Sequence, residues 1–235
     1  AEGRKLSKRD GVTSINDFRS MGYTAEAIAN YMTLLGWSVP EGMEERFTLS
    51  QAADVFGFDR VNKAGARFDW DKLNWLNAQV LHGLTPEQLL DAAAPLWRQK
   101  KWSLPDDPSW SLALCELLGP SLTLLKDAVD QAQPFFVCPE LQEDGLKQLN
   151  VEGSRSALNH LVESLEADPW DGIDIAEAQS MLADAANRAG VKKGVVMKSL
   201  RAALLGRLQG PDLITTWSLL ARIRQDLPRL KRCLP

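Results

Sequence analysis

Apolar residues recur at helical spacing along nearly the whole chain, whereas the strict alternation typical of strands is almost absent. Two segments begin with a strong helix N-terminal signature: Thr48 is followed by Gln51, and Thr85 by Pro86 and Gln88. We expect helices after both, and further helices over residues 14–21, 24–35, 69–81, 109–118, 121–131, 154–167, 174–189, 193–208 and 212–232, the last broken near Pro228. The pattern therefore predicts an all-α fold.

Stretches rich in Pro, Gly and Asp separate some of these helices, at "SVPEGM" (38–43), "SLPDDPS" (103–109) and "EADPWDG" (166–172). Such stretches loosely indicate domain boundaries. A chain of 235 residues has room for more than one small domain, because domains commonly hold about 100 to 150 residues. We see no internal repeat.

Eight tryptophans are numerous for this length: Trp37, Trp70, Trp75, Trp97, Trp102, Trp110, Trp170 and Trp217. Exposed aromatic rings can stack on unpaired bases in nucleic-acid binders. Most of these tryptophans, however, lie at predicted helix ends or on apolar faces, where a large ring seals the core of a small domain. We therefore expect packing rather than base stacking.

No apolar run approaches the roughly 18 residues needed to span a bilayer. The three cysteines, Cys115, Cys138 and Cys233, are widely spaced and form no pair typical of a metal site. His82 and His160 have no cysteine or second histidine at helical spacing. We expect a cytoplasmic protein with reduced cysteines, no membrane association and no bound metal.

Charge is distributed unevenly along the chain. The net charge is -4, yet residues 188–235 carry eleven Lys and Arg against two Asp, a surplus of +9 that leaves -13 elsewhere. A basic end on an acidic body is typical of a protein whose one face meets a polyanion. Solvated helix faces would give the same count, so both interpretations stay open.

The first residues, "GRKLSKRDG" (3–11), set four cations around one serine between glycines. Taken with "KLSKRDGVTSINDFRSMGYTAEAIANYMTLLGWS", "FTLSQAADVFGFDRVNKAGARFDWDKLNWLN" and "GVKKGVVMKSLRAALLGRLQGPDL", this stretch makes the chain resemble the C-terminal half of bacterial-type glutamyl-tRNA synthetases, which are class I aminoacyl-tRNA synthetases. The resemblance covers essentially the whole chain and is most specific in residues 5–77 and 190–213.

In that family "KLSKR" is similar to the Lys-Met-Ser-Lys-Ser loop, which closes over ATP. The resemblance implies that Lys5, Ser7 and Lys8 take part in catalysis, that Lys5 and Lys8 approach the phosphates of ATP, bound with Mg²⁺, and that Leu6 lies by the adenine. Cations there stabilise charge that builds as a carboxylate attacks the α-phosphate. The His-Ile-Gly-His-like element and the amino-acid pocket have no counterpart in the sequence, so we expect a fragment that is inactive alone.

The resemblance also implies four segments: a signature ATP loop left from the catalytic domain (1–12), a stem-contact helical domain (13–84), and a two-part α-helical anticodon-binding cage (85–152 and 153–235). In the stem-contact segment the candidate phosphate contacts are Lys63, Arg67 and Lys72. The residues expected to pack beside them are Phe68, Leu73, Trp75 and Leu76.

By the same resemblance, Arg201 is the leading reader of anticodon bases, with Gly210, Pro211 and Leu213 forming the adjoining surface. A planar guanidinium suits the edges of splayed, unpaired bases. Some family members carry a polar residue at the position of Gly210, so one hydrogen bond is missing here. The cations expected to meet tRNA phosphates nearby are Lys192, Lys193, Lys198 and Arg207.

The function implied is the attachment of glutamate to tRNA(Glu) through an ATP-dependent glutamyl adenylate, by a monomer. Family members that accept only tRNA(Glu) often carry an arginine in the helix that here reads "LLGPSLTLLKD", and residues 119–122 supply none. Relaxed discrimination, with tRNA(Gln) also charged, is the resulting hypothesis. A free-standing helical RNA-binding or regulatory module is the alternative, although it would not need Lys5, Ser7 and Lys8. An unrelated helical scaffold conflicts with the concentrated motif.

Overall fold

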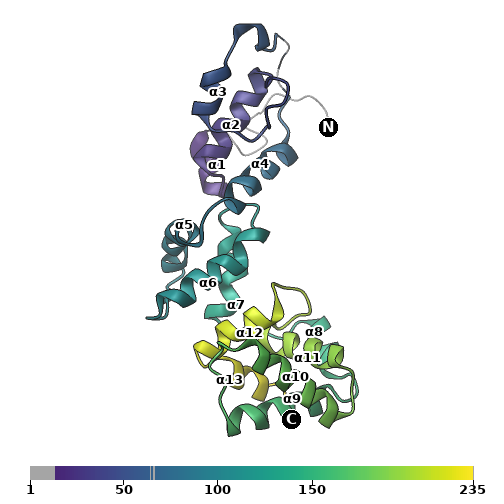
Figure 1. Cartoon of the computed structure of the whole chain (residues 1–235). Helices are drawn as coiled ribbons and strands as arrows, with labels where there is room; N and C mark the ends of the chain where they lie inside the picture. Colours follow the sequence, from purple (N-terminus) through teal and green to yellow (C-terminus); the bar gives the residue numbers. More distant parts are fainter. Residues whose placement is uncertain (1–13, 64, 66, 235) are drawn as a thin grey trace. The chain divides into compact units, whose positions relative to one another are not determined.

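The computed structural model describes residues 14–63, 65 and 67–234. Within these ranges the regular structure is helical, and the one extended pairing is an isolated antiparallel bridge between Trp37 and Val61 (Figure 1). The all-α prediction is therefore confirmed. In the same ranges, no helix is long and apolar enough to cross a membrane.

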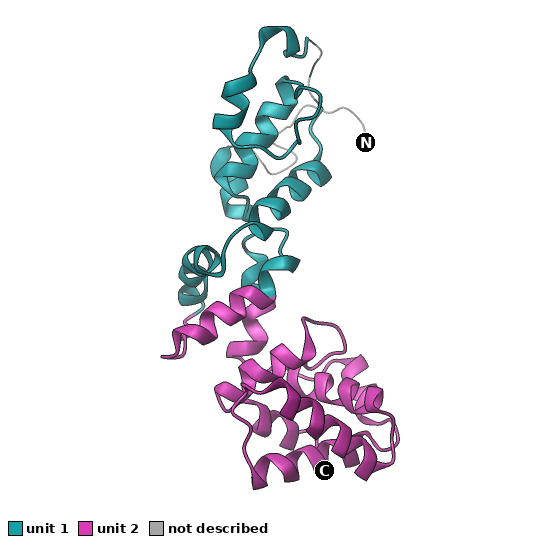
Figure 2. Cartoon of the chain, viewed as in Figure 1, with its two compact units in different colours: residues 1–100, 118–130 teal, residues 101–117, 131–235 magenta. Residues whose placement is uncertain are grey.

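The chain divides into two compact units, the first within residues 1–100 and 118–130 and the second within residues 101–117 and 131–235 (Figure 2). The first, unit 1, holds helices α1 (Ile15–Met21), α2 (Ala25–Gly36), α3 (Leu49–Val55), α4 (Trp70–His82) and α5 (Pro86–Gln99), and the short 3₁₀ helices η2 (Phe58–Arg60) and η3 (Gly119–Ser121). The domain boundaries after residues 12, 84 and 152 stay a prediction.

The two helix starts predicted from the signatures at Thr48 and Thr85 are confirmed in atomic detail. Thr48 accepts a hydrogen bond from the backbone N–H of Gln51, and the Gln51 side chain accepts one from the N–H of Thr48. Thr85 and Gln88 form the same reciprocal capping box at the start of α5. These caps satisfy N–H groups that a helix leaves without intrahelical partners.

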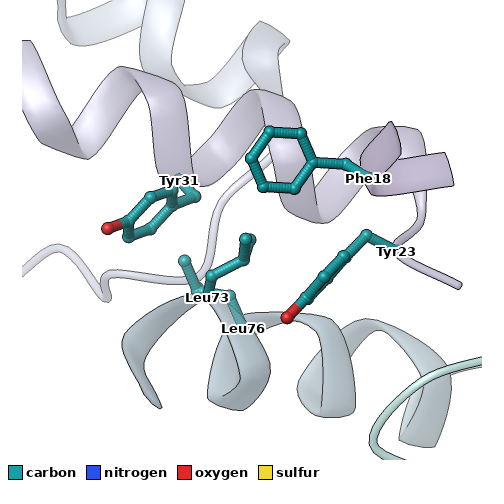
Figure 3. Close-up of a cluster of buried hydrophobic side chains, with 5 residues drawn as sticks. All are labelled: Phe18, Tyr23, Tyr31, Leu73 and Leu76. Carbon is teal, nitrogen blue, oxygen red and sulfur yellow. The ribbon is translucent and has the colours of Figure 1, made fainter. Parts of the chain in front are cut away.

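The main core of unit 1 lies between α4 and the α1–α2 pair. The rings of Phe18, Tyr23 and Tyr31 face Leu73 and Leu76, which project from one side of α4 (Figure 3). All five side chains are buried. Leu73 and Leu76 are thus confirmed as packing residues, and α4 is fixed against α2 along its apolar side.

The helix predicted over residues 121–131 is wrong at its start. Gly119–Ser121 forms η3, and α7 (Asp127–Phe136) begins six residues later than expected. The carbonyls of the intervening segment have tertiary partners: His82 Nε2 lies 2.9 Å from the Leu122 oxygen, and Asn77 donates to the Thr123 oxygen at 2.6 Å. Tertiary hydrogen bonds from α4 therefore override the local helical pattern.

Unit 2 contains most of α6 (Pro108–Leu118), the end of α7, and helices α8 (Glu143–Leu149), α9 (Ser154–Ala167), α10 (Ile175–Ala189), α11 (Lys193–Leu205), α12 (Leu213–Arg222) and α13 (Asp226–Lys231). Helix α9 packs against α10 and α11, and α11 packs against α8. Trp170 and Trp217, both buried, meet edge to face with ring centroids 4.8 Å apart. These contacts give unit 2 its own core.

Three sequence expectations for unit 2 need correction. Helix α8 was not predicted, and the helix expected to run to residue 208 ends at Leu205 because Gly206 turns into the left-handed region at φ 74°. The final break falls over residues 223–225, with Arg224 at φ 58°, rather than at Pro228. Pro228 instead lies in the first turn of α13, where a missing N–H costs no helical hydrogen bond.

The tryptophan prediction holds for most of the set. The five buried tryptophans are Trp37, Trp97, Trp110, Trp170 and Trp217. Trp75 contradicts the prediction, because 43% of it is exposed, and the ammonium of Lys72 lies 4.5 Å from the centre of its ring. Position 75 falls on the side of α4 away from Leu73 and Leu76, so the ring covers the Lys72 side chain instead of the core.

Candidate nucleic-acid interface

Arg201, near the end of α11, reaches the loop that follows this helix. Its Nη1 donates to the Pro211 carbonyl oxygen at 2.7 Å, and a Cβ added at Gly210 would lie 3.5 Å from the same nitrogen. Arg201 is half-buried and Gly210 is exposed. The structure therefore brings Arg201, Gly210 and Pro211 together at the α11–α12 loop (residues 206–212), as predicted.

The electrostatics of this loop centre on Arg201 and Asp212. Burial lowers the pKa of the Arg201 guanidinium, while the nearby Asp212 carboxylate opposes that shift. Burial raises the pKa of Asp212, but hydrogen bonds from Thr215 and Ile214, with the charge of Arg201, outweigh it and hold this pKa below its usual value. Both side chains stay charged near neutral pH.

Leu213 does not belong to the surface that the sequence suggested. It is 2% exposed and forms the first residue of α12. Asp212 caps this helix by accepting from the Thr215 backbone N–H at 2.9 Å, which turns Leu213 inward. Its role is therefore to anchor the loop in the core rather than to contact RNA.

The start of α8 holds the other end of the α11–α12 loop. Asp144 Oδ2 accepts a hydrogen bond from the Leu208 backbone N–H at 2.9 Å, and the Gln142 N–H donates to the Gly206 oxygen at 2.7 Å. Sequence reasoning missed Asp144 because α8 itself was missed. A carboxylate at a helix start was the available signal, but it pointed to capping and not to a distant loop.

Four predicted phosphate contacts lie on or beside α11. Lys192 precedes its first residue, Lys193 opens it, and both are exposed, as is Lys198. Arg207, just past the end, is half-buried. Within the described ranges none of the four has a carboxylate within ion-pair distance. Cations at a helix N-terminus oppose the helix dipole, so this placement disfavours the helix slightly.

Other cations of the basic C-terminal region are engaged within unit 2. Arg222 donates to Asp107 Oδ2 at 2.5 Å, Lys231 pairs with Glu166, and Arg188 pairs with Glu163. Arg229 is 1% exposed, and its Nη1 donates to the Leu204 oxygen at 2.8 Å. The surplus of +9 thus overstates the charge available to an external polyanion.

In unit 1 the three predicted phosphate contacts differ in what surrounds them. Lys63 and Arg67 are exposed. Lys72 is half-buried and forms an ion pair with Glu45 besides its contact with Trp75. Arg67 and Lys72 both line a cavity of about 360 Å³, together with Tyr31, Trp37, Glu45 and Asp69. Glu45 was not predicted, because it is distant in sequence and lies in a loop.

Two further sets of predicted positions are not part of the α11–α12 loop. Lys5, Leu6, Ser7 and Lys8 lie outside the described residues. Residues 119–122, which lack an arginine, form η3 and its exit rather than part of one helix, and they belong to unit 1, whereas Arg201 belongs to unit 2. Gly119 is buried, and a Cβ there would lie 3.3 Å from Leu89.

Residues 88–234 match the family model described as an anticodon binding domain, and residues 1–75 match that of the catalytic domain of class I (E and Q) tRNA synthetases. The first match covers more than half of the sequence. The chain belongs to the anticodon-binding domain family. The resemblance to glutamyl-tRNA synthetases is also confirmed, since the similar proteins described next carry that name.

The glutamate–tRNA ligase of Parasynechococcus marenigrum (strain WH8102) is 76% identical over 234 residues, which cover 100% of this chain and 49% of that protein. That of Synechococcus sp. (strain CC9902) is 73% identical with the same coverage. A solved glutamate tRNA ligase from Elizabethkingia meningosepticum CCUG26117, in complex with its amino acid, matches with TM-score 0.85 at 25% identity, over 98% of this chain and 48% of that one. The chain spans about half the length of the curated relatives it matches.

Proposed function

We propose that this chain is the tRNA-binding portion of a glutamate–tRNA ligase that joins glutamate to tRNA(Glu) through an ATP-dependent glutamyl adenylate. The observation that carries the proposal is the half-buried guanidinium of Arg201 at an exposed loop, in a segment that matches an anticodon-binding family. One of its five N–H donors is directed to Pro211, which fixes the plane of the fork and leaves other donors for base edges.

The phosphate contacts in this proposal are cations on both units, all exposed except Arg207 and Lys72, which are half-buried. On unit 2 they are Lys192, Lys193, Lys198 and Arg207, and on unit 1 they are Lys63, Arg67 and Lys72. The ion pair between Lys72 and Glu45 means that Lys72 must exchange or share a partner when a phosphate arrives. We therefore expect Lys72 to contribute less to tRNA affinity than Lys192 or Lys193.

The signature loop supplies the chemistry in the intact ligase. Lys5 and Lys8 would approach the phosphates, Ser7 would hydrogen-bond within the loop or to the nucleotide, and Leu6 would lie by the adenine. By the same resemblance, Mg²⁺ enters the proposal together with ATP. On the resemblance alone, we further propose a cytoplasmic monomer.

Relaxed tRNA choice is the finer part of the proposal. The two anticodons share their first and second bases, which Arg201 would read, and they differ at the third, which pairs with the first codon base. Residues 119–122 contain no arginine to test that third base. We therefore propose that tRNA(Gln) binds about as well as tRNA(Glu) and is also charged.

The test is a binding titration of this chain with tRNA(Glu), tRNA(Gln) and a tRNA(Glu) whose anticodon bases are replaced. Arg201→Ala should weaken binding of both natural tRNAs by about 1 to 3 kcal/mol, the range for one good base contact. The control is Arg98→Ala, which removes an exposed arginine from the end of α5. Unchanged affinity in Arg201→Ala would contradict the base-reading role.

Two further measurements address the ATP loop and the choice of tRNA in the intact ligase. Lys8→Ala should lower the rate of glutamate activation by about two to four orders of magnitude while leaving tRNA affinity unchanged, because the cation acts mainly in the transition state. This chain alone should show no glutamate-dependent pyrophosphate exchange. A preference of about a hundredfold for charging tRNA(Glu) over tRNA(Gln) would contradict relaxed discrimination.

A further inference from the structure

Asp144, in the first turn of α8, joins two parts of unit 2 through one carboxylate oxygen, while the other bonds within its own helix. Its Oδ2 accepts from the backbone N–H of Leu208 in the α11–α12 loop at 2.9 Å, and its Oδ1 accepts from the N–H of Gly145 at 2.8 Å. Asp144 is half-buried. Hydrogen bonds from an N–H to a carboxylate are stronger than those between neutral groups, so this contact holds Leu208 firmly.

The backbone around Asp144 makes the same connection at three further points. The Gln142 N–H donates to the Gly206 oxygen at 2.7 Å. A Cβ added at Gly145 would lie 2.5 Å from the Gly206 oxygen, and one added at Gly206 would lie 2.1 Å from the Glu140 oxygen. Both positions therefore require glycine, because any side chain would separate the two backbones.

Beyond Gly206, the α11–α12 loop is thus fixed at two further places along its length. Asp144 holds it at Leu208, and three residues later Pro211 accepts the hydrogen bond from Arg201 Nη1 at 2.7 Å. If Leu208 is released, the carbonyl of Pro211 loses its fixed position. The guanidinium that depends on that carbonyl then loses its orientation as well.

We propose that Asp144 is a positioning residue for base recognition: by holding the Leu208 N–H it fixes the α11–α12 loop and thereby the plane of the Arg201 guanidinium. Asp144 need not touch RNA to do this. The inference rests on the proposed base-reading role of Arg201 and names a residue on another helix through which that role is controlled.

The experiment compares Asp144→Ala with Glu143→Ala in this chain. Glu143→Ala removes the same charge from the same turn of α8. The partner of Glu143, however, is Lys147 on the same helix and not the α11–α12 loop. Binding is measured to natural tRNA(Glu) and to tRNA(Glu) with replaced anticodon bases. Asp144→Ala should bind natural tRNA(Glu) about tenfold more weakly, the size expected for losing one charge-assisted hydrogen bond. Glu143→Ala should stay near the parent.

A merely structural role would weaken the binding of both tRNAs alike. An equal loss of affinity for natural tRNA(Glu) and for tRNA(Glu) with replaced anticodon bases would therefore overturn the proposal. The proposal predicts no loss on the replaced anticodon. It also predicts that Asp144→Ala adds little to Arg201→Ala in the double variant, because both act through one contact. If Asp144→Ala folds too poorly to assay, Asp144→Asn, which keeps one acceptor oxygen, should show a smaller loss confined to the natural anticodon.

The base-reading role of Arg201 and the positioning role of Asp144 are overturned by different results. If Arg201→Ala binds natural tRNA(Glu) like the parent, the base-reading role itself is wrong. If Arg201→Ala weakens binding while Asp144→Ala and Asp144→Asn do not, only the positioning role of Asp144 is overturned.

Discussion

The arginines of α12 and α13 and the lysines at the start of α11 carry the same formal charge, but their surroundings differ. Arg229 is buried and donates to Leu204, and Arg222 is bound to Asp107. Lys192 and Lys193, in contrast, are exposed and lie at the end of a helix where positive charge is unfavourable.

The difference separates cations that stabilise the fold from cations available to a polyanion. Removing Arg222 or Arg229 breaks contacts between elements of unit 2, so the first consequence is on stability. Removing Lys192 or Lys193 breaks no ion pair among the described residues, so the first consequence is on binding. Each prediction below tests one side of this division.

The largest effect is expected at Arg229. Arg229→Ala should lower the free energy of unfolding of unit 2 by about 3 kcal/mol, because it leaves a void and an unpaired Leu204 oxygen in the core. Denaturant unfolding measures this loss.

The control for this variant is Arg229→Met, which keeps the packing of the long side chain. Burial lowers the pKa of Arg229 to about 10. The charged guanidinium is therefore less favourable in the folded protein than in the unfolded chain. Removing that charge compensates in part for the lost hydrogen bond, and the methionine variant should lose far less stability than the alanine variant. Equal losses in both would show that the lost hydrogen bond to Leu204, rather than the packing, sets the cost.

A smaller effect of opposite sign is expected at the start of α11. Lys192→Gln/Lys193→Gln should raise the free energy of unfolding by about 0.5 to 1 kcal/mol, since it removes two cations from the positive end of the helix dipole. Thermal unfolding at low salt is the measurement. A loss of stability would mean that these lysines belong to the fold after all.

The smallest effect is expected at Asp107, which is exposed. Hydrogen bonds from Ser109 and then from Arg222 lower the pKa of its carboxyl to about 2. A carboxyl whose pKa is lowered on folding contributes stability above its unfolded pKa of about 4, and that contribution is lost as the pH falls towards 2. The unfolding temperature of Arg222→Gln should therefore depend less on pH between 4 and 2 than that of the parent. Matching acid limbs in the two proteins would contradict this account.

Much of the fold could be predicted from local signals. The capping boxes at Thr48 and Thr85 mark two helix starts, and the apolar periodicity of α9 gives residues 154–167 without error. The failures have tertiary causes. Asn77 and His82 bind the backbone of residues 122–123, which keeps this segment from forming a helix. Helix α8 was missed because it contains a glycine, Gly145, which is needed there for the close approach to Gly206.

The candidate site divides in the same way. Two features agree with expectation. Lys192, Lys193 and Lys198 are exposed, and Arg201 contacts the loop at Gly210 and Pro211. Leu213 and Trp75 do not agree with expectation, because helix capping by Asp212 turns the first inward and the orientation of α4 turns the second outward. Asp144 acts across 64 residues of sequence, a separation that no local pattern reveals.

We expect the exposed lysines of α11 to meet tRNA phosphates and the ion-paired cations of unit 2 not to do so. The direct test is the salt dependence of tRNA(Glu) binding for three proteins: the parent chain, Lys192→Gln/Lys193→Gln, and the charge-matched control Arg188→Gln/Lys231→Gln, whose cations are ion-paired in the fold. A plot of log affinity against log salt should be shallower by about two in the lysine variant, since each phosphate contact contributes about 0.9 to the slope, and the control should keep the slope of the parent. Equal slopes in all three proteins, or a shallower slope in the control alone, would contradict the claim.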